Sequence, residues 1–509
     1  MEILFNNQAL ELDPNEKVVL TLQQNDLGDI SKSNTSFTNS FKIKKTGNNV
    51  KVMEYLGVNG SSTRIPYQLN RVTIIENSIV LMENGYAEIT DNDPKNYTIN
   101  IYGAEKNFFE KVKNLTLKDA FPDMIITWTN TNLVPYLTSN EIICLPIAQY
   151  NKDSYHTDVP DAFSTFSITE ILNTTPHFFV KHLFESIFTY LGYTLNYPIG
   201  DDEVFKKMVI PCQKGVSHFN ISEGTPFNIK NCVQEVGCDV LIKEIMYRYG
   251  MSFSCDESRK IVTFTQLNTL IKSASTVNWS EKFDSHKSTK YNLSGYARKN
   301  YFLYSEDTQD PNYSASTTNY LRGQFEIDNE RLGMENTVIT SQFQKAMMYG
   351  KTYSSGQLHG EIDFGGSVGR YSLMNVAENL INDDGEVELR ENPFQLMYLK
   401  TLPTTLNVHL RQPTGNLIKN VPARICTHDF LSFQYFIDQH YPEIVNLFNN
   451  MVVLKGVFKL SLLDVYRFNF YRRIYLEQYG SFFYVNRISN WENGKLCEVE
   501  LIQIPPVID

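Results

Sequence analysis

Apolar and polar residues alternate along the first 150 residues of the chain. Short alternating runs occupy residues 17–23, 39–45, 84–90 and 96–103. A period of two predicts half-buried strands, and the "DNDPKN" segment at residues 91–96 predicts a turn between the last two. Short strands separated by Gly, Asn and Pro predict an antiparallel sandwich or barrel.

The apolar spacing changes to steps of three and four after residue 175. One helical face carries Val180, Leu183, Phe184, Ile187, Phe188 and Leu191. We expect Thr175 to cap this helix, Pro176 to lie in its first turn, and Gly192 to end it in the left-handed conformation. Tyr193, Leu195 and Tyr197 then alternate into a strand.

The same helix–Gly–strand order recurs about 58 residues later. Leu241, Ile245 and Tyr249 share a helical face, Gly250 ends the helix, and residues 252–255 and 261–265 predict two strands around the "DESRK" turn. Alignment of the two units matches Leu183 with Leu241, Ile187 with Ile245, and Gly192 with Gly250. The pattern is explained either by an internal repeat or by two independent copies of a common unit.

The chain closes on a predicted β-hairpin around Asn493 and Gly494. Its strands include Phe482 and Tyr484 before the turn, and afterwards Cys497, Val499 and Leu501 on one face with Glu498 and Glu500 on the other. Asn-Gly favours the positive φ of a tight turn. Two interpretations stay open: the hairpin offers a free edge to a neighbouring subunit, or it completes the sheet of its own domain.

The complete pattern predicts a β-dominated α+β protein with several domains, in which a few helices pack on antiparallel barrels or sandwiches. We expect an N-terminal β domain at 1–150, a helix–strand domain at 151–275, a central β domain with long loops at 276–424, and a C-terminal helix and hairpin domain at 425–509. A long exposed loop is expected at 309–323, and a helix is expected over 430–447 with Pro442 opening its second part.

Length and composition support this division. The chain has 509 residues, of which 42% are hydrophobic and 13% aromatic, which suffices for several cores. The formal net charge of -11 argues against a surface that grips nucleic acid, but a like-charged wall suits a passage through which DNA moves. We expect no signal peptide and no membrane insertion. The seven scattered cysteines predict reduced, mostly buried thiols.

Candidate chemistry is sparse. Cys426, His428 and Asp429 are close in sequence, but an ordinary loop explains them better than a nucleophile. The "GGSVGR" segment at 365–370 lacks the Lys-Ser/Thr of a phosphate loop, and "NDDGEVELRE" at 382–391 lacks the spacing of a calcium loop. No histidine or cysteine spacing predicts zinc. We therefore expect no catalytic residue, cofactor or metal.

Several segments resemble phage tail proteins. The unit around Leu241, Ile245, Gly250, Phe253, Asp256 and Val262 resembles a recurring element of phage tail hub proteins. Residues 27–49, 296–332 and 482–502 are similar to predicted tail proteins of phages that infect Bacteroides- and Flavobacterium-like hosts. Together, these three segments cover under a quarter of the chain.

This resemblance implies a hub or baseplate protein of the virion tail, assembled in the host cytoplasm. Hub subunits of this type form trimers in which each chain presents two similar β domains, so that three chains approximate a sixfold ring between tube and spike. The implied partners are further copies of the chain, as a trimer or hexamer, and other tail proteins, with DNA only as passing cargo. The helix–Gly–strand units do not flank two matched barrels, which places the sixfold matching in doubt. The alternatives are a neck or ring protein of a short-tailed phage, a virion enzyme that degrades glycans or cell wall, and a receptor-binding module.

Overall fold

The computed structural model describes most of the chain. The described residues are 1–23, 35–146, 149–150, 167–168, 172, 174, 176–212, 221–273, 275–291, 295–305, 321–344, 351–352, 358–359, 361–363, 370–372, 375–377, 379–381, 387–389, 395–412 and 415–505. The loops expected at 309–323, 365–370 and 382–391 lie largely outside these ranges.

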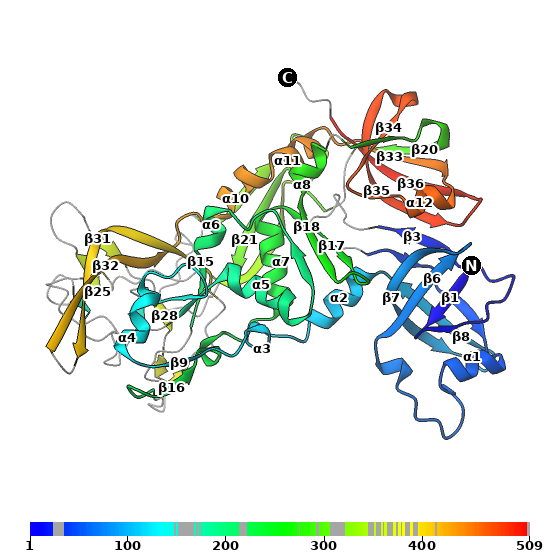
Figure 1. Cartoon of the computed structure of the whole chain (residues 1–509). Coiled ribbons are helices and arrows are strands. Elements are labelled where there is room, and N and C mark those ends of the chain that lie inside the picture. Colours follow the sequence, from blue (N-terminus) through cyan, green and yellow to red (C-terminus); the bar gives the residue numbers. More distant parts are fainter. Residues whose placement is uncertain are drawn as a thin grey trace.

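The predicted β-dominated α+β class is confirmed. Figure 1 shows two β units side by side at one end of the molecule, a central unit of helices and sheets, and a long hairpin at the opposite end. The largest sheet combines strands from the first 102 residues with strands from 276–290 and 453–503. Since sheet membership alone does not define domains, the four predicted boundaries stay a prediction.

The first β unit, called here the N-terminal β unit, contains most of the strands that alternation predicted. Its elements are β1 (Glu2–Phe5), β2 (Gln8–Ala9), β3 (Leu20–Leu22), β4 (Phe37–Thr38), β5 (Phe41–Lys44), α1 (Gly47–Val52), β6 (Asn70–Glu76), β7 (Ile79–Asn92) and β8 (Asn96–Tyr102). Buried residues alternate with exposed ones along β5 and with half-buried ones along β8, as expected for strands with one face on a core.

The second, called the C-terminal β unit, is assembled from two distant parts of the chain. Its elements are β19 (Thr276–Asn278), β20 (Phe283–Lys290), β33 (Val453–Lys459), α12 (Leu462–Tyr466), β34 (Arg473–Leu476), β35 (Ser481–Trp491) and β36 (Leu496–Gln503). The last two strands are the predicted hairpin. Gly494 has φ +78°, whereas Asn493 is not among the residues with positive φ. The turn therefore differs from the two-residue turn in which both positions are left-handed.

The two β units share one strand order. In the first, β5 leads through α1 to β6, β7 and β8, and β8 returns to pair with β5. In the second, β33 leads through α12 to β34, β35 and β36, and β36 returns to pair with β33. β1 on β6 corresponds to β19 on β34, although the first pair is antiparallel and the second parallel. β3 on β4 corresponds to β20 on β33.

The correspondence extends to single residues. Lys44 and Lys459 pair with the first residues of β8 and β36, respectively. Two residues later, Thr46 and Ser461 cap α1 and α12 through their side-chain oxygens. A hydroxyl cap at this position satisfies a backbone N–H of the first helical turn, so both strands end at the same kind of corner.

β3 joins the two units into one continuous sheet. Leu20 lies opposite Trp491 and Leu22 opposite Ile488, in antiparallel register with β35. Leu20, Trp491 and Ile488 are fully buried, and apolar side chains of both units form a single core. The two units are therefore packed together as well as hydrogen-bonded.

The central unit contains both predicted helix–Gly–strand segments. Its main elements are β13 (His177–Phe179), α5 (Val180–Tyr190), β14 (Thr194–Asn196), α6 (Glu203–Lys207), β15 (Met208–Pro211), α7 (Cys238–Arg248), β17 (Met251–Asp256), β18 (Ile261–Gln266), α8 (Leu267–Ile271), β21 (Lys299–Ser305), β22 (Gly323–Glu326), β23 (Glu335–Gln344), α10 (Phe433–His440) and α11 (Pro442–Asn449). β14 pairs with β18 in parallel and β17 with β18 antiparallel, so both segments contribute to one sheet beside α5 and α7.

Two helix boundaries differ from the prediction. Pro176 precedes β13 instead of opening α5, whose N-cap is Phe179 without a side-chain hydrogen bond, and Thr175 lies outside the described residues. The apolar "HFF" segment pairs with β15, and this tertiary contact overrides the local capping pattern. The helix expected from residue 430 begins at Phe433, and Pro442 opens α11 as predicted.

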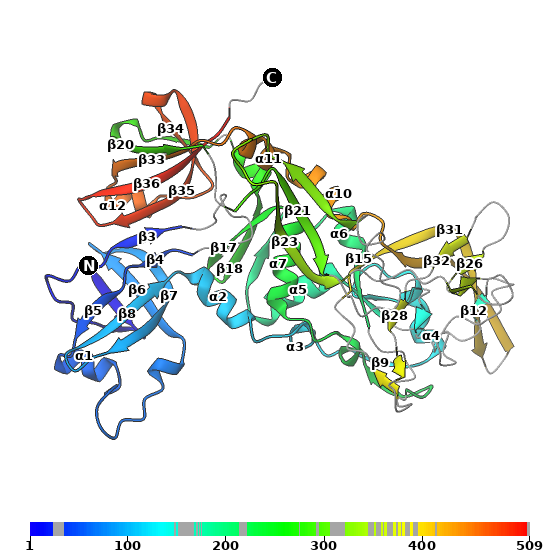
Figure 2. The same cartoon turned by 180° about the vertical axis from the view of Figure 1, so that it is seen from behind.

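A helical linker and a long hairpin complete the chain. α2 (Ala104–Val112) connects the N-terminal β unit to the central unit, followed by α3 (Leu117–Ala120), β9 (Ile125–Thr127), α4 (Asn130–Leu133) and β10 (Ile143–Cys144). β31 (Met397–Gln412) and β32 (Gly415–Thr427) form the hairpin that extends from the central unit, seen from behind in Figure 2. Across the described residues, no helix combines the length and apolar character that crossing a membrane requires.

Candidate functional site

The residues predicted for the two helix–Gly–strand units lie in one core. Leu183, Ile187, Leu241 and Ile245 are buried together. Gly192 and Gly250 have φ +75° and +55°, respectively, as the left-handed helix ends require. These residues position the central sheet, and whether they derive from a repeat stays a prediction.

Both strands of the terminal hairpin are paired on both sides within this chain. β36 pairs with β33 and β35, and β35 pairs on its other side with β34 and β3. The free-edge interpretation is therefore wrong, and the hairpin completes its own sheet. Tyr484, Val499 and Leu501 are buried within it, whereas Phe482 is 39% exposed. Asn493 reaches the neighbouring unit, where its Nδ2 lies 3.4 Å from Glu76 Oε1.

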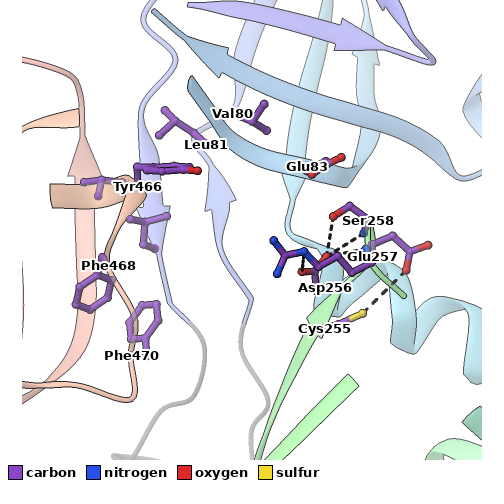
Figure 3. A pocket seen from close by; sticks show the side chains of 14 residues that line it. Val80, Leu81, Glu83, Cys255, Asp256, Glu257, Ser258, Tyr466, Phe468 and Phe470 are labelled. Carbon is purple, nitrogen blue, oxygen red and sulfur yellow. Dashed lines mark hydrogen bonds and ion pairs between the residues drawn. The ribbon is translucent and has the colours of Figure 1, made fainter. Parts of the chain in front are cut away.

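A groove of about 710 Å³ lies where the two β units meet the β17–β18 turn (Figure 3). Apolar side chains from both β units form one wall: Leu22, Val80, Leu81, Val465, Tyr466, Phe468 and Phe470. Polar side chains form the other: Glu83, Asp256, Glu257, Ser258 and Arg259. The groove therefore has one apolar and one polar wall.

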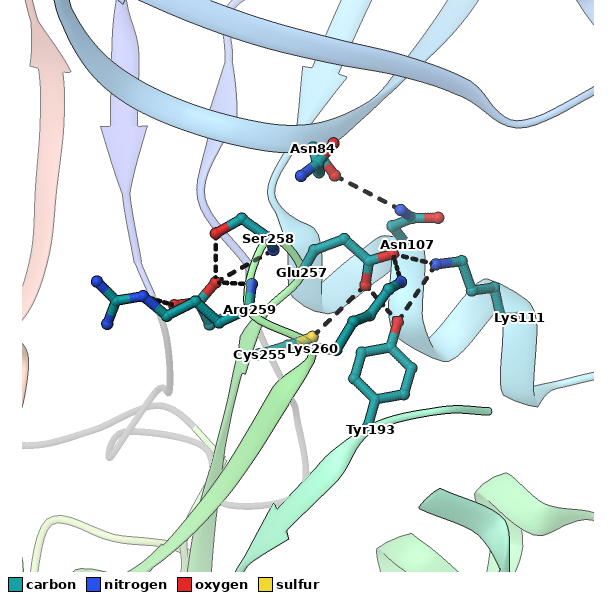
Figure 4. Close-up of polar contacts among 10 residues, drawn as sticks. Asn84, Asn107, Lys111, Tyr193, Cys255, Glu257, Ser258, Arg259 and Lys260 are labelled. Carbon is teal, nitrogen blue, oxygen red and sulfur yellow. Dashed lines mark hydrogen bonds and ion pairs between the residues drawn. The ribbon is translucent and has the colours of Figure 1, made fainter. Parts of the chain in front are cut away.

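Glu257 is the centre of a polar cluster beside this groove (Figure 4). Its side chain is 1% exposed, and Lys111 Nζ and Lys260 Nζ both lie 2.5 Å from its Oε1. The other oxygen, Oε2, accepts a hydrogen bond from the Tyr193 hydroxyl. Lys111 comes from α2, Tyr193 precedes β14, and Lys260 lies in the β17–β18 turn, so one carboxylate fastens three segments.

The electrostatics of the two neighbouring carboxylates do not favour acid–base chemistry. Burial by itself would raise the pKa of Glu257, but the hydrogen bonds from Lys111 and Lys260 hold it below the ordinary value. Burial would also raise the pKa of Asp256. Its carboxylate accepts hydrogen bonds from the backbone N–H groups of Arg259 and Ser258 and from the Ser258 hydroxyl, and these bonds hold its pKa below the ordinary value. A catalytic carboxyl pair needs one member with a raised pKa. This arrangement supplies a clamp between segments.

A second buried ionic cluster lies inside the central unit. Glu244 and Arg248 of α7 are 3% and 0% exposed, respectively, and are paired at 2.6 Å. Arg248 also donates to the Leu431 carbonyl (3.1 Å) and the Tyr304 hydroxyl (2.7 Å), while Ser341 donates to Glu244 (2.7 Å). The cluster ties α7 to β21, β23 and the segment before α10.

Cys426 and Asp429, which the sequence analysis considered as reactive groups, lie in environments typical of structural residues. Cys426 is buried at the end of β32, where burial raises its thiol pKa and keeps it protonated. Asp429 is paired with Lys400 at 2.6 Å. Within the described ranges, no group of three or more His, Cys, Asp or Glu side chains is arranged to hold a metal ion.

Both ionic clusters were missed by sequence reasoning. Glu244 and Arg248 are four residues apart, a spacing that signals a helical ion pair, and that signal was available in the sequence. For Glu257, the sequence predicts only a position in a turn. Its partners Lys111 and Tyr193 are 146 and 64 positions away in the sequence, so no local pattern connects them.

No protein-family model matches the sequence, and no curated protein does. Several solved structures are similar to it at low identity, and the following three are among them. The 43 kDa tail protein of prophage MuSo2 from Shewanella oneidensis is 8% identical, with 99% of each chain covered and a TM-score of 0.37. Prophage tail protein gp18 from Listeria monocytogenes EGD-e is 7% identical, with 99% of this chain and 94% of that chain covered and a TM-score of 0.33. A chain of the Francisella PdpA-VgrG complex is 11% identical, with 81% of this chain and 50% of that chain covered and a TM-score of 0.22. Similarity at these scores establishes neither a shared fold nor a shared function.

Proposed function

We propose that this chain is a structural component of a phage tail, of the hub or baseplate type, which joins the tail tube to the spike and borders a passage for DNA. The observation that carries the proposal is the pair of β units with one strand order, joined edge to edge through β3 and β35. The sequence resemblance implies two similar β domains per subunit. Three copies would then supply six units.

The arrangement of the units supports this proposal. The helix–Gly–strand segments lie together in the central unit, and the matched pair consists of the two β units on either side of them in the sequence. A trimer of such chains can present three central units on one side and six β units in a ring, because closed rotational symmetry satisfies every interface. In this proposal, the net charge of -11 keeps passing DNA from binding to the ring.

The two β units would lie in the virion tail, in contact with tube and spike proteins. A neck or ring protein of a short-tailed phage would use the same closed symmetry with different neighbours. Co-purification distinguishes them: the chain should associate with tube or spike proteins and not with the portal end of the particle.

Mass measurement of the purified full chain, alone and mixed with tail proteins, tests the proposal. We expect a closed trimer or hexamer, formed by the chain alone or on mixing. A chain that stays monomeric in both conditions would overturn the proposal.

The enzyme alternative is tested separately on host cell wall and glycans. Activity lost in Asp256→Asn or Glu83→Gln, both in the groove, would replace the structural function with a catalytic one. Host-cell binding by the isolated chain, without tail proteins, would instead favour the receptor-binding alternative.

A further inference from the structure

The correspondence between the two β units identifies strand edges that are paired in one unit and open in the other. β35 pairs with β34 along its first half, and β3 occupies the second half of the same edge. β7 pairs with β6 only as far as Ala87. Within the described residues, no strand pairs with residues 88–92 of β7 on the side of β6.

These open residues correspond to the covered ones. Asp91 pairs with Thr98, the third residue of β8, and Ser489 pairs with Glu498, the third residue of β36. Asn92 therefore corresponds to Asn490, whose backbone N–H lies 3.4 Å from Thr21 Oγ1 of β3. The half-edge that β3 covers in the C-terminal β unit is exposed in the N-terminal β unit, where Glu88, Thr90, Asp91 and Asn92 are all exposed.

The strand that corresponds to β3 has an open outer edge. β20 pairs with β33 on one side, and in the described part of the chain no strand pairs with its other side. Lys290 pairs with Val453 as Leu20 pairs with Thr38, so Tyr291 corresponds to Thr21. Tyr291 is 64% exposed, so its side chain is accessible to a neighbouring chain.

The two open edges have opposite charges. The end of β20 carries Lys290, while the open half of β7 carries Asp91. The neighbouring Lys287 and Glu88 are already paired within the chain, with Glu498 and Lys106 respectively. Complementary charge on two unpaired edges favours their association and opposes the pairing of either edge with itself. Since β7 and β20 lie at opposite ends of the strand series β7-β8-β4-β3-β35-β36-β33-β20, they cannot join within one chain without closing the sheet on itself.

Side chains beside the β3–β35 junction also have exposed counterparts beside the two open edges. Val80, the second residue of β7, lines the groove opposite Val465 and Tyr466 at the end of α12. Phe482, the second residue of β35, is similarly exposed (39% against 38% for Val80). Tyr55, which lies shortly after the end of α1, is 55% exposed. A second copy docked in the same manner would cover Phe482 with the α1 end of its N-terminal β unit.

We infer that β20 of one copy pairs with residues 88–92 of β7 in a second copy, and so repeats between chains the β3–β35 junction that exists within each chain. The inference rests on the proposed ring-forming function and names the strands that close the ring. Each copy offers β20 to one neighbour and β7 to the other. This head-to-tail contact closes when the rotation per chain divides a full turn.

Disulfide trapping tests this pairing in the full chain. Asn92→Cys with Tyr291→Cys places thiols at the positions that correspond to Asn490 and Thr21. Mild oxidation should give covalent multimers up to the size of the complete ring, because every chain links to two neighbours. Gln8→Cys with Tyr291→Cys is the matched control, since β2 is another exposed strand at the end of the sheet, and it should give none. The native cysteines are buried or half-buried, so the introduced thiols dominate the reaction.

Amide hydrogen exchange of the unmodified chain is a second test of the pairing. It does not depend on whether the cysteine variants fold. Residues 88–92 and the end of β20 should exchange more slowly in the assembled ring than in the monomer. The inference would be overturned by a ring that forms without this protection and without covalent multimers of the Asn92→Cys, Tyr291→Cys variant, and the proposed function would then still stand. A chain that never assembles would overturn both.

Discussion

Arg248 and Glu244 lie one helical turn apart on α7 and are enclosed by protein, with Arg248 Nη2 2.6 Å from Glu244 Oε1. The guanidinium also stacks 4.5 Å from the Phe433 ring centroid. Taking both charges out of water is costly, and the surrounding hydrogen bonds offset that cost only while both partners are present.

Arg248→Met should therefore destabilise the central unit by about 3–5 kcal/mol, because it leaves a buried carboxylate without its counter-ion. Urea unfolding monitored by near-ultraviolet circular dichroism measures the change. The double variant Glu244→Gln with Arg248→Met is the control and should be less destabilised than Arg248→Met alone. Equal losses in the two variants would contradict this account of the pair.

The Glu257 clamp predicts a specific pH dependence. The folded state lowers the pKa of Glu257, so its stabilisation is present above the ordinary value and is lost as the pH falls through the lowered folded value. Between about pH 6 and pH 3, the stability of the native chain should fall more steeply than that of Glu257→Gln. Thermal unfolding across this pH series checks the difference, and parallel curves would contradict it.

The two helix-ending glycines predict unequal costs of substitution. A Cβ at Gly250 would lie 3.1 Å from the His440 carbonyl oxygen, whereas a Cβ at Gly192 meets no atom within 4 Å. Both positions have positive φ, so alanine should cost about 1 kcal/mol at each, with a further loss at Gly250 alone. Chemical unfolding of Gly192→Ala and Gly250→Ala compares them directly, and the reverse order would contradict the steric argument.

The helix caps of the two β units predict a further paired comparison. Ser461 and Asp464 form a capping box at α12, while Thr46 caps α1 by its side chain alone. Ser461→Ala should cost about 1 kcal/mol. Thr46→Ala should cost less, and the free energies of unfolding of the two variants decide the order.

Charge reversal predicts the strength of the contact between copies. Lys290→Glu and Asp91→Lys should each lower the association constant by about five- to tenfold, because each places like charges on the paired edges. The double variant should recover most of the loss. Sedimentation at low and high salt measures all three, and a double variant no better than the singles would count against the pairing of β20 with β7.

Local structure was largely predictable because its causes are local. The apolar spacing of Leu241 and Ile245, with Gly250 after them, defines a helix, its buried face and its end. The start of α5 was mispredicted because β15, about 30 positions later, recruits Phe178 into a strand. The capping signal of Thr175 and Pro176 is weaker than that contact.

The matched β units and the ionic clusters were beyond sequence reasoning. Lys44 and Lys459 are one of the few identical pairs at corresponding positions of the two β units. The similarity of the units lies instead in the order in which their strands pair. The sequence therefore indicates a possible repeat only in the helix–Gly–strand units, which belong to neither of the two matched β units. For Glu257, the clamp depends on residues from three segments, whose proximity only the fold provides.

The pairing of Thr21 with Asn490 spans 469 positions of the chain. During synthesis, β3 emerges from the ribosome long before β35 exists, so the outer edge of β3 stays unpaired until β35 has been translated. Partly made chains thus lack the bridge between their two β units and present a different outline to potential neighbours. Translation order would thus delay association between copies until β35 has been made.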